Sequence, residues 1–214
     1  MKSVCPTKIF LVRHGQSEWN GKKIISGQLD PPLSKKGINQ AAALAEILQG
    51  EALSAIYTST LQRSFETARP TAESHRIFIQ KKEALMEIHL GILQGRYRDD
   101  RDPEAQRLWE TRAEDRLTHR IPGGETFSEL HQRVIPCIQE ILRKEAGKVI
   151  LIVGHRNTNR VILGELMQWP PEAVIDLKLR SKYLYEITFG DDPMIRTICL
   201  EDEKPGLAIE SFIV

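Results

Sequence analysis

The chain contains little cysteine, and what it contains forms no pattern. Its 214 residues include three cysteines, Cys5, Cys137 and Cys199, which lie far apart and form no CxxC pair. An odd number of widely spaced cysteines argues against a disulfide framework. We therefore expect reduced thiols that are buried or incidental.

Long hydrophobic stretches are absent as well. No run reaches the ~18 apolar residues that a membrane-spanning helix needs. The first residues, MKSVCPTK, lack the apolar region of a secretory signal peptide. These absences argue against a membrane partner and predict a cytoplasmic protein.

Neither sign of charge is in excess. Lysine and arginine number 30 and aspartate and glutamate 29, so the formal net charge is +1. A chain so nearly neutral has no overall field to attract nucleic acid or an anionic membrane. We expect no nucleic-acid partner, and any site for anions must be local.

Two common catalytic motifs are missing. There is no GxxxxGK[ST] loop, which argues against ATP-driven chemistry, and no HExxH pair of the kind that binds zinc. Glu87 and His89 are two residues apart, but one such pair does not make a metal site. We expect no metal.

What is present is an alternation of short apolar runs and helical patterns. Residues 7–12 and 148–153 are nearly continuous apolar and β-branched runs, typical of strands covered on both faces. The alternation predicts an α/β fold, a three-layer α/β/α sandwich with a mostly parallel central sheet and an antiparallel edge. The other expected elements are helices at 35–49, 60–74 and 126–145, and strands at 55–58, 77–80, 183–189 and 194–200.

Two of these helices have a clear apolar face. The first is capped by Ser34, and its apolar positions are Ile38, Ala41, Ala42, Ala45 and Leu48. The apolar positions of the longest helix are Phe127, Leu130, Val134, Cys137, Ile138 and Ile141.

No repeat, low-complexity tract or linker divides the chain. Its length suits a single domain over residues 1–214. The charged segment 96–120 is the candidate for a cap or lid. We expect a helix anchored by Leu108 and Trp109 there, and a surface that sets substrate choice.

Two of the expected strands end at a histidine. His14 follows Arg13 at the end of the first strand, and His155 follows LIVG at the end of another. In open α/β sheets, ligands bind outside the carboxyl ends of the strands. The two histidines are therefore expected to share one site.

The residues around them suit phosphoryl transfer. A neutral imidazole is a good nucleophile near pH 7, because its ordinary pKa is ~6.5. Arg13 and Arg63 offer planar, permanently charged donors for phosphoryl oxygens, and Asn20 adds a neutral donor. Gly15 lets the backbone approach closely. Glu87 is the candidate acid for a leaving alkoxide.

Six motifs, in order along the chain, resemble those of the histidine phosphatase superfamily, the phosphoglycerate-mutase-like family. They are LVRHGQSEWN, SGQLDPPLSKKGINQA, YTSTLQRSFETA, EIHLG, PGGETF and VGH. The resemblance covers most of the chain, from residue 8 to about residue 163.

This resemblance implies a phosphohistidine mechanism that needs no metal or other cofactor and acts on a small phosphorylated molecule. His14 would attack the phosphoryl group, and Glu87 would protonate the leaving oxygen and then activate water. The phosphoryl oxygens would be held by Arg13, Arg63 and a protonated His155. The further substrate-binding positions would be Asn20, Ser26 and Gly27.

Hydrolysis is favoured over phosphoglycerate mutase activity. Mutases of this family resemble one another in a long insertion after the acid, whereas only residues 88–122 separate Glu87 from Gly123. Two details favour the mutase alternative. GILQGR resembles the GxLQG of mutases, and Asn157 matches the asparagine of their HGNS motif.

Arg156 stands where the family normally has glycine. Either it points to solvent, or it contacts a second phosphate or a carboxylate of the substrate, together with Arg160. At a helix N-terminus its charge would add to a site that already favours anions.

A third reading is a protein that binds phosphorylated ligands without turnover. Such members usually lose a catalytic residue, whereas all six expected positions are present. The apolar tail, residues 211–214, is expected to pack against the body or against a second copy in a homodimer.

Overall fold

A seven-stranded mixed sheet forms the centre of the molecule. The computed structural model describes residues 6–190, 193–201 and 208–209. The strand order is β3-β2-β4-β1-β5-β6-β7, in which β5 and β7 run opposite to the others. The strands are β1 (Lys8–Arg13), β2 (Leu53–Thr58), β3 (Ile79–Lys81), β4 (Val149–Gly154), β5 (Tyr183–Thr188), β6 (Met194–Cys199) and β7 (Ala208–Ile209).

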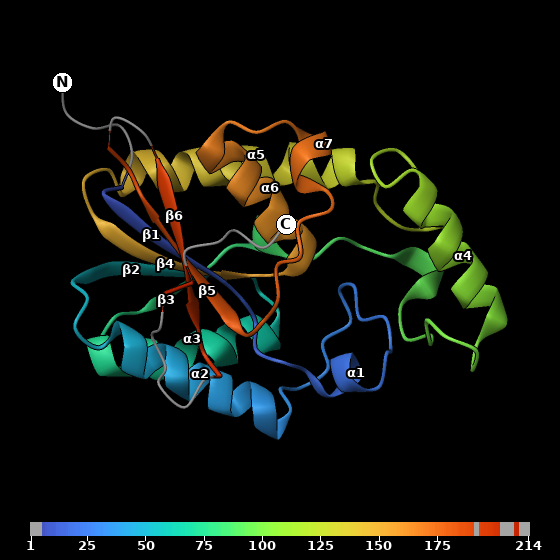
Figure 1. Ribbon diagram of the computed structural model, residues 1–214, viewed down its shortest axis with the longest axis horizontal. Helices are drawn as coiled ribbons and strands as arrows, with labels where there is room; N and C mark the ends of the chain where they lie inside the picture. Colours follow the sequence, from blue (N-terminus) through green and yellow to red (C-terminus); the bar gives the residue numbers. More distant parts are fainter. Residues whose placement is uncertain (1–5, 191–192, 202–207, 210–214) are drawn as a thin grey trace.

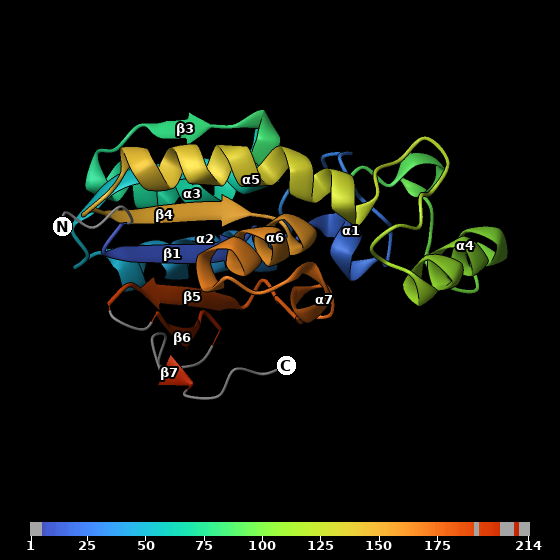
Figure 2. The same ribbon diagram turned by 90° about the horizontal axis from the view of Figure 1, so that it is seen from above.

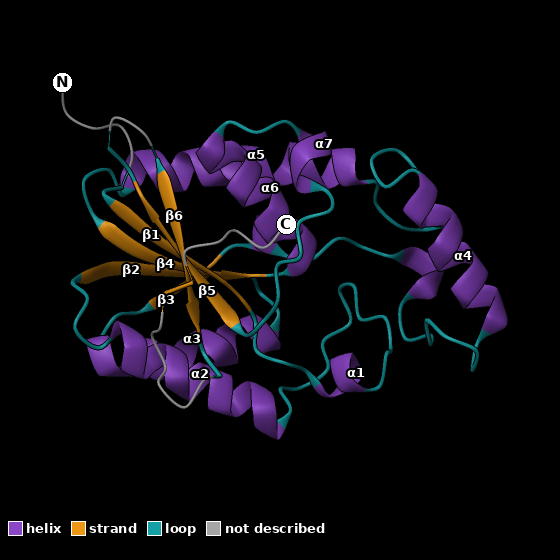
Figure 3. Cartoon of the chain, viewed as in Figure 1, coloured by secondary structure: helices purple, strands orange, loops and turns teal. Residues whose placement is uncertain are grey.

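Helices cover both faces of this sheet (Figures 1 and 3). α2 and α3 lie on one face, and α5 and α6 lie on the other, which confirms the three-layer sandwich with a mostly parallel sheet and an antiparallel edge. The α-helices are α1 (Glu18–Gly21), α2 (Lys35–Leu48), α3 (Gln62–His75), α4 (Pro103–Glu114), α5 (Phe127–Lys144), α6 (Arg156–Met167) and α7 (Pro171–Val174).

The central part of β1 is continuously apolar, from Ile9 to Val12, because both of its faces are covered. Ile9 and Leu11 of β1 join the core that includes α5 and α6, while Phe10 and Val12 join the core beneath α2 and α3. All four side chains are at most 1% exposed. Successive residues of a strand point to opposite faces, so a continuous apolar run is what a sandwiched strand requires.

The predicted apolar face of the longest helix is confirmed. α5 buries the six positions expected from the sequence. It begins with a capping box, in which Thr126 accepts a hydrogen bond from the backbone of Glu129 and the Glu129 carboxylate accepts one from the backbone of Thr126.

The predicted face of α2 is partly wrong. Ser34 caps the helix as expected and accepts a hydrogen bond from Gly37 N at 3.2 Å. Ile38, which is 58% exposed, and Ala42 face solvent, however, whereas Leu44 is buried. The first turn of α2 packs tightly on the preceding loop, because a Cβ on Gly37 would lie 2.2 Å from Gln16 O.

The third strand is shorter than predicted and begins two residues later. Only Ile79–Lys81 pairs with β2, and Phe78 is 95% exposed. β3 is an edge strand, so few partners constrain where its pairing begins. Residues 191–192 between β5 and β6, Cys5 and the tail 211–214 lie outside the described residues.

The segment expected to form a cap contains α4. Figures 1 and 2 show α4 and α1 at the end of the molecule opposite the N-terminus. Leu108 and Trp109 are partly buried and pack against the core, as anticipated for the anchor of this helix. Within the ranges described above, no helix is long and apolar enough to cross a membrane.

Candidate active site

His14 lies at the carboxyl end of β1, beside the end of β4. The parallel register pairs Arg13 with Gly154, and His14 N donates to Gly154 O at 2.9 Å. The imidazole Nδ1 lies 2.7 Å from Gly15 O. A carbonyl oxygen only accepts, so Nδ1 carries the hydrogen and Nε2 has the free lone pair.

The surroundings of His14 keep it neutral. Its side chain is buried, and burial together with the charges of Arg63 and Arg13 lowers the pKa of His14 well below 6.5. Arg63 Nε donates to His14 Nε2 at 3.3 Å. The free lone pair of His14 Nε2 thus faces a fixed cation.

His155 lies beside His14 and is not one of the residues that line the cavity. The two ring centroids are 5.1 Å apart, and His155 is fully buried. Burial, Arg63 and His14 lower the pKa of His155 well below 6.5, so the expectation of a protonated imidazole is wrong for this structure.

Ser59 determines which nitrogen of His155 carries the hydrogen. Ser59 Oγ accepts from Leu61 N at 3.2 Å and lies 2.8 Å from His155 Nε2. Among the described residues, the hydroxyl of Ser59 has no other acceptor, so we assign its hydrogen to the bond with Nε2 and the ring hydrogen to Nδ1. This Nδ1 group is buried without a hydrogen-bond partner among the described residues. Buried donors of this kind are rare and favour an acceptor such as a ligand oxygen.

Arg63 is held by the loop that follows α1. It lies in the first turn of α3 and is 1% exposed. Its guanidinium donates to the carbonyl oxygens of Gly27 and Leu29, each at 2.7 Å, and to Asp30 Oδ1 at 3.1 Å. Asp30 also accepts from the backbone N–H groups of Gln62 and Arg63, so one carboxylate caps the helix and holds its arginine.

Arg13 differs from Arg63 because part of its guanidinium has no hydrogen-bond partner among the described residues. Its Nε group is buried and lacks a hydrogen-bond partner in the described part of the chain. Burial and the nearby charge of Arg156 lower the pKa of Arg13 to about 9, so the group is still charged at neutral pH. A guanidinium with a buried, unpartnered N–H group is a strong site for an oxyanion.

Glu87 reaches the same cavity from the segment between the two 3₁₀ turns at Glu83–Leu85 and Gly91–Leu93. Its carboxylate accepts from Ile88 N at 2.9 Å and from Asn157 N at 3.2 Å, at the N-terminus of α6. Arg133 of α5 donates to Glu87 O at 3.0 Å, and Arg133 is itself paired with Glu125. The acid therefore has a rigid mount.

Three predicted binding residues of the N-terminal loops line the cavity. Asn20 accepts from Ser17 N at 3.1 Å in the capping box of α1, so its Nδ2 hydrogens are not used by that bond. Ser26 Oγ is buried with no partner within the described ranges. Gly27 has a φ of +51°, and a Cβ there would lie 2.2 Å from Gln94 Oε1, so a larger residue would be strained and would displace the Gln94 side chain.

The structure separates Arg156 from Arg160. Arg156 lines the cavity, which favours the substrate-facing alternative over the solvent-facing one. Arg160 does not line the cavity, because its guanidinium donates to Leu177 O and to Asn157 Oδ1. Its expected contribution beside Arg156 is therefore wrong. Asn157 lines the cavity and supports both Glu87 and Arg160.

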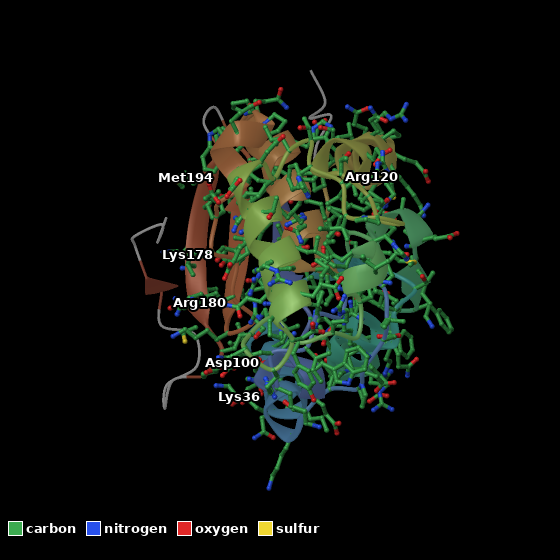
Figure 4. The ribbon with its side chains drawn as sticks, turned by 90° about the vertical axis from the view of Figure 1, so that its right-hand side faces the viewer. Lys36, Asp100, Arg120, Lys178, Arg180 and Met194 are labelled. Atoms are coloured by element: carbon green, nitrogen blue, oxygen red, sulfur yellow. The ribbon has the colours of Figure 1, made fainter. Side chains whose placement is uncertain are left out.

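The cavity as a whole is strongly cationic. It has a volume of about 320 Å³, and its wall contains five arginines but one carboxylate, Glu87. Sequence reasoning missed Arg98 and Arg180 as members of this wall and assigned Trp109 only to the cap. Figure 4 views the molecule from the end that carries α4 and labels Arg180, which comes from the loop before β5.

His89 has a structural role. Its Nδ1 accepts from Gly91 N at 3.1 Å, and its Nε2 lies 3.2 Å from the side-chain nitrogen of Gln94. In the described part of the chain, no three His, Cys, Asp or Glu side chains gather as metal ligands would.

An imidazole, arginines and a carboxylate around one cavity at the ends of parallel strands define the class of this protein. Residues 9–196 match the histidine phosphatase superfamily (branch 1), and the chain belongs to this family.

Relatives with assigned names fall on both sides of the division between phosphatases and mutases. A probable phosphoglycerate mutase GpmB of Yersinia enterocolitica is 30% identical over 188 residues, which are 88% of this chain and 87% of the relative. A mycobacterial glucosyl-3-phosphoglycerate phosphatase is 25% identical, with a TM-score of 0.78 over 88% of this chain and 97% of that one. A putative alpha-ribazole-5'-P phosphatase of Escherichia coli shares the fold, with a TM-score of 0.82, 24% identity, and coverage of 94% of this chain and 99% of that one.

Proposed function

We propose that the protein is a phosphomonoester hydrolase that forms a phosphohistidine on His14 and uses Glu87 as proton donor. The observation that carries the proposal is the environment of His14. Its Nδ1 is committed to Gly15 O, and its Nε2 faces Arg63, beside the unpaired Arg13. A neutral nucleophile flanked by fixed cations suits the attack on a phosphoryl dianion.

In the first step, the lone pair of His14 Nε2 forms a bond to phosphorus. The bond from phosphorus to the ester oxygen breaks, and this oxygen takes the proton of the Glu87 carboxylic acid. Arg13 binds the equatorial oxygens, and Arg63 Nε turns from Nε2 to the phosphoryl group. The Nδ1 hydrogen of His155, which has no other partner, is a further donor.

In the second step, the Glu87 carboxylate takes a proton from water. The water oxygen bonds to phosphorus while the bond to His14 Nε2 breaks, and its electron pair returns to the imidazole. Phosphate leaves, and Glu87 is protonated again. The N–H groups of Ile88 and Asn157 stabilise the carboxylate between the two steps.

Phosphoglycerate mutase is the second candidate, and the Yersinia relative favours it. The GILQGR motif, which resembles a mutase motif, is weak support for mutase activity, because its glutamine does not line the cavity. Gln94 accepts hydrogen bonds from Gln28 N at 2.7 Å and Leu90 N at 3.3 Å, and it does not line the cavity. These hydrogen bonds hold two loops together, and a hydrolase requires such loops to be fixed as much as a mutase does.

The test is phosphate release from p-nitrophenyl phosphate and common phosphorylated metabolites, with EDTA present. We expect His14→Ala to abolish turnover and His131→Ala, a histidine outside the cavity wall, to leave it unchanged. An alkaline quench should retain a phosphorylated protein only when His14 is present.

A parallel assay follows the conversion of 3- to 2-phosphoglycerate with and without 2,3-bisphosphoglycerate. Isomerisation that depends on this primer, with little phosphate release, would replace the hydrolase by the mutase. Binding of phosphate esters without either reaction would support a non-catalytic ligand-binding protein instead.

A further inference from the structure

Three arginines line the cavity in addition to Arg13 and Arg63. Arg98 precedes α4, Arg156 is the first residue of α6, and Arg180 precedes β5. They come from three separate segments, so their meeting is a property of the fold rather than of one basic stretch. The reaction at His14 assigns no task to any of them.

The fold does not neutralise these charges. Among the described residues, no carboxylate forms an ion pair with Arg98, Arg156 or Arg180. Neighbouring arginines of the same segment do form ion pairs. Arg96 pairs with Asp102 and Glu104, and Arg101 pairs with Asp99. Arg98, which lies between them in sequence, faces the cavity instead.

The cationic charge exceeds what one phosphoryl group balances. Five arginines line the cavity, whereas the carboxylates available are Glu87 in the wall and Asp30 behind Arg63. Both histidines at the strand ends are neutral. A phosphoryl dianion would leave a positive charge unbalanced, and this excess grows when Glu87 is protonated. Unpaired charge in a partly buried site is costly and favours an anion there.

We infer that the substrate carries a second anionic group, a carboxylate or a second phosphate, on its leaving part, and that Arg98, Arg156 and Arg180 bind this group. The inference rests on the proposed hydrolase function and names its substrate class. Trp109 of α4, which also lines the cavity, supplies an apolar surface for the body of the leaving group. The cap segment therefore contributes to substrate choice through both Arg98 and Trp109.

The test uses aryl esters that differ only at the distal group. These are 4-carboxyphenyl phosphate, its neutral analogue 4-carbamoylphenyl phosphate, and the bisphosphate of hydroquinone. In the wild type at fixed ionic strength, we expect kcat/KM for the better of the two anionic esters to exceed that of the neutral ester by about tenfold or more, the effect of one or two charged hydrogen bonds. Which anionic ester is preferred distinguishes a carboxylate from a second phosphate.

The variants Arg98→Gln, Arg156→Gln and Arg180→Gln should each reduce this preference several-fold. Arg107→Gln is the matched control, because Arg107 is exposed on α4 outside the cavity wall and its loss removes the same charge. A preference near one, or one that the three variants do not change, would overturn the inference even if His14-dependent hydrolysis occurs.

A binding measurement tests the anionic subsite independently of the proposed hydrolysis. Titration calorimetry of the same esters with His14→Ala protein measures the subsite without turnover. Tighter binding of an anionic ester, lost when Arg156→Gln is added, supports the subsite even if the wild type hydrolyses nothing. Equal binding of the charged and neutral esters would contradict it.

Discussion

Arg63 and His14 depend on a carboxylate that contacts no reacting atom. Asp30 accepts from the Arg63 guanidinium at 3.1 Å and from the backbone at the start of α3. Two further N–H groups of Arg63 donate to carbonyl oxygens, and Nε donates to His14 Nε2. In the proposed mechanism Asp30 is a positioning residue, since it orients the cation that faces His14 Nε2.

Replacing this carboxylate tests the arrangement. We expect Asp30→Asn to lower kcat/KM for p-nitrophenyl phosphate by about tenfold or more, because hydrogen bonds to charged groups contribute roughly 1.5–3 kcal/mol. Asp176→Asn is the control, since Asp176 pairs with Arg116 outside the cavity wall. A variant that loses stability but keeps its kcat/KM would show that Asp30 is only structural.

At the scale of single residues, the sequence predicts those site residues that lie directly at the ends of strands. His14, Arg13 and His155 follow apolar runs, so their location at one edge of the sheet could be read from the pattern. Arg98 and Arg180 carry no such signal. They reach the cavity because loops far apart in sequence converge there, and neither periodicity nor strand position describes the path of a loop.

At the scale of elements, a glycine contact fixes the loop that carries His14 against α2. A Cβ on Gly15 would lie 2.6 Å from Gly37 O, and one on Gly37 would lie 2.2 Å from Gln16 O. Gly15 was expected to let the backbone approach the ligand. Its close neighbour is instead the first turn of α2. The loop is held further by Thr67 of α3, which accepts from Gly15 N at 2.9 Å.

This contact makes Gly37 sensitive to the smallest substitution. We expect Gly37→Ala to destabilise the protein by about 2 kcal/mol or more, because backbone must move, and to lower kcat by displacing the segment next to His14. Gly50→Ala is the matched control, because a Cβ there meets nothing within 4 Å. Equal stability and activity of the two variants in urea unfolding and turnover assays would show that α2 can shift without affecting the site.

The length and the buried face of an element could be predicted from the sequence only where the surrounding core requires apolar residues at defined positions. β1, β4 and α5 match their patterns because the apolar residues that define each pattern are mostly buried. The face of α2 and the start of β3 could not be predicted in the same way. The first depends on a backbone contact between glycines, and the second is an edge strand with a single partner.

At the scale of the whole molecule, the two neutral histidines couple stability to pH. Folding buries His14 and His155 and lowers the pKa of each well below 6.5. As the pH falls through 6.5, the unfolded chain takes up protons at these positions while the folded protein does not. The unfolded state therefore gains stability below pH 6.5, and the free energy of unfolding decreases in that range.

Urea unfolding at pH 7.5, 6.5 and 5.5 measures this dependence. Each histidine contributes up to about 1.4 kcal/mol per pH unit below 6.5, so we expect the wild type to lose about 1–3 kcal/mol between pH 7.5 and 5.5. The double variant His14→Gln, His155→Gln should lose less over the same interval. Paired carboxylates such as Glu129, whose pKa is lowered to about 2, affect stability only at lower pH, because their unfolded values are near 4. An equal loss in the wild type and the double variant would mean that folding leaves the proton affinity of these histidines unchanged, and the neutral nucleophile at His14 would have to be abandoned with it.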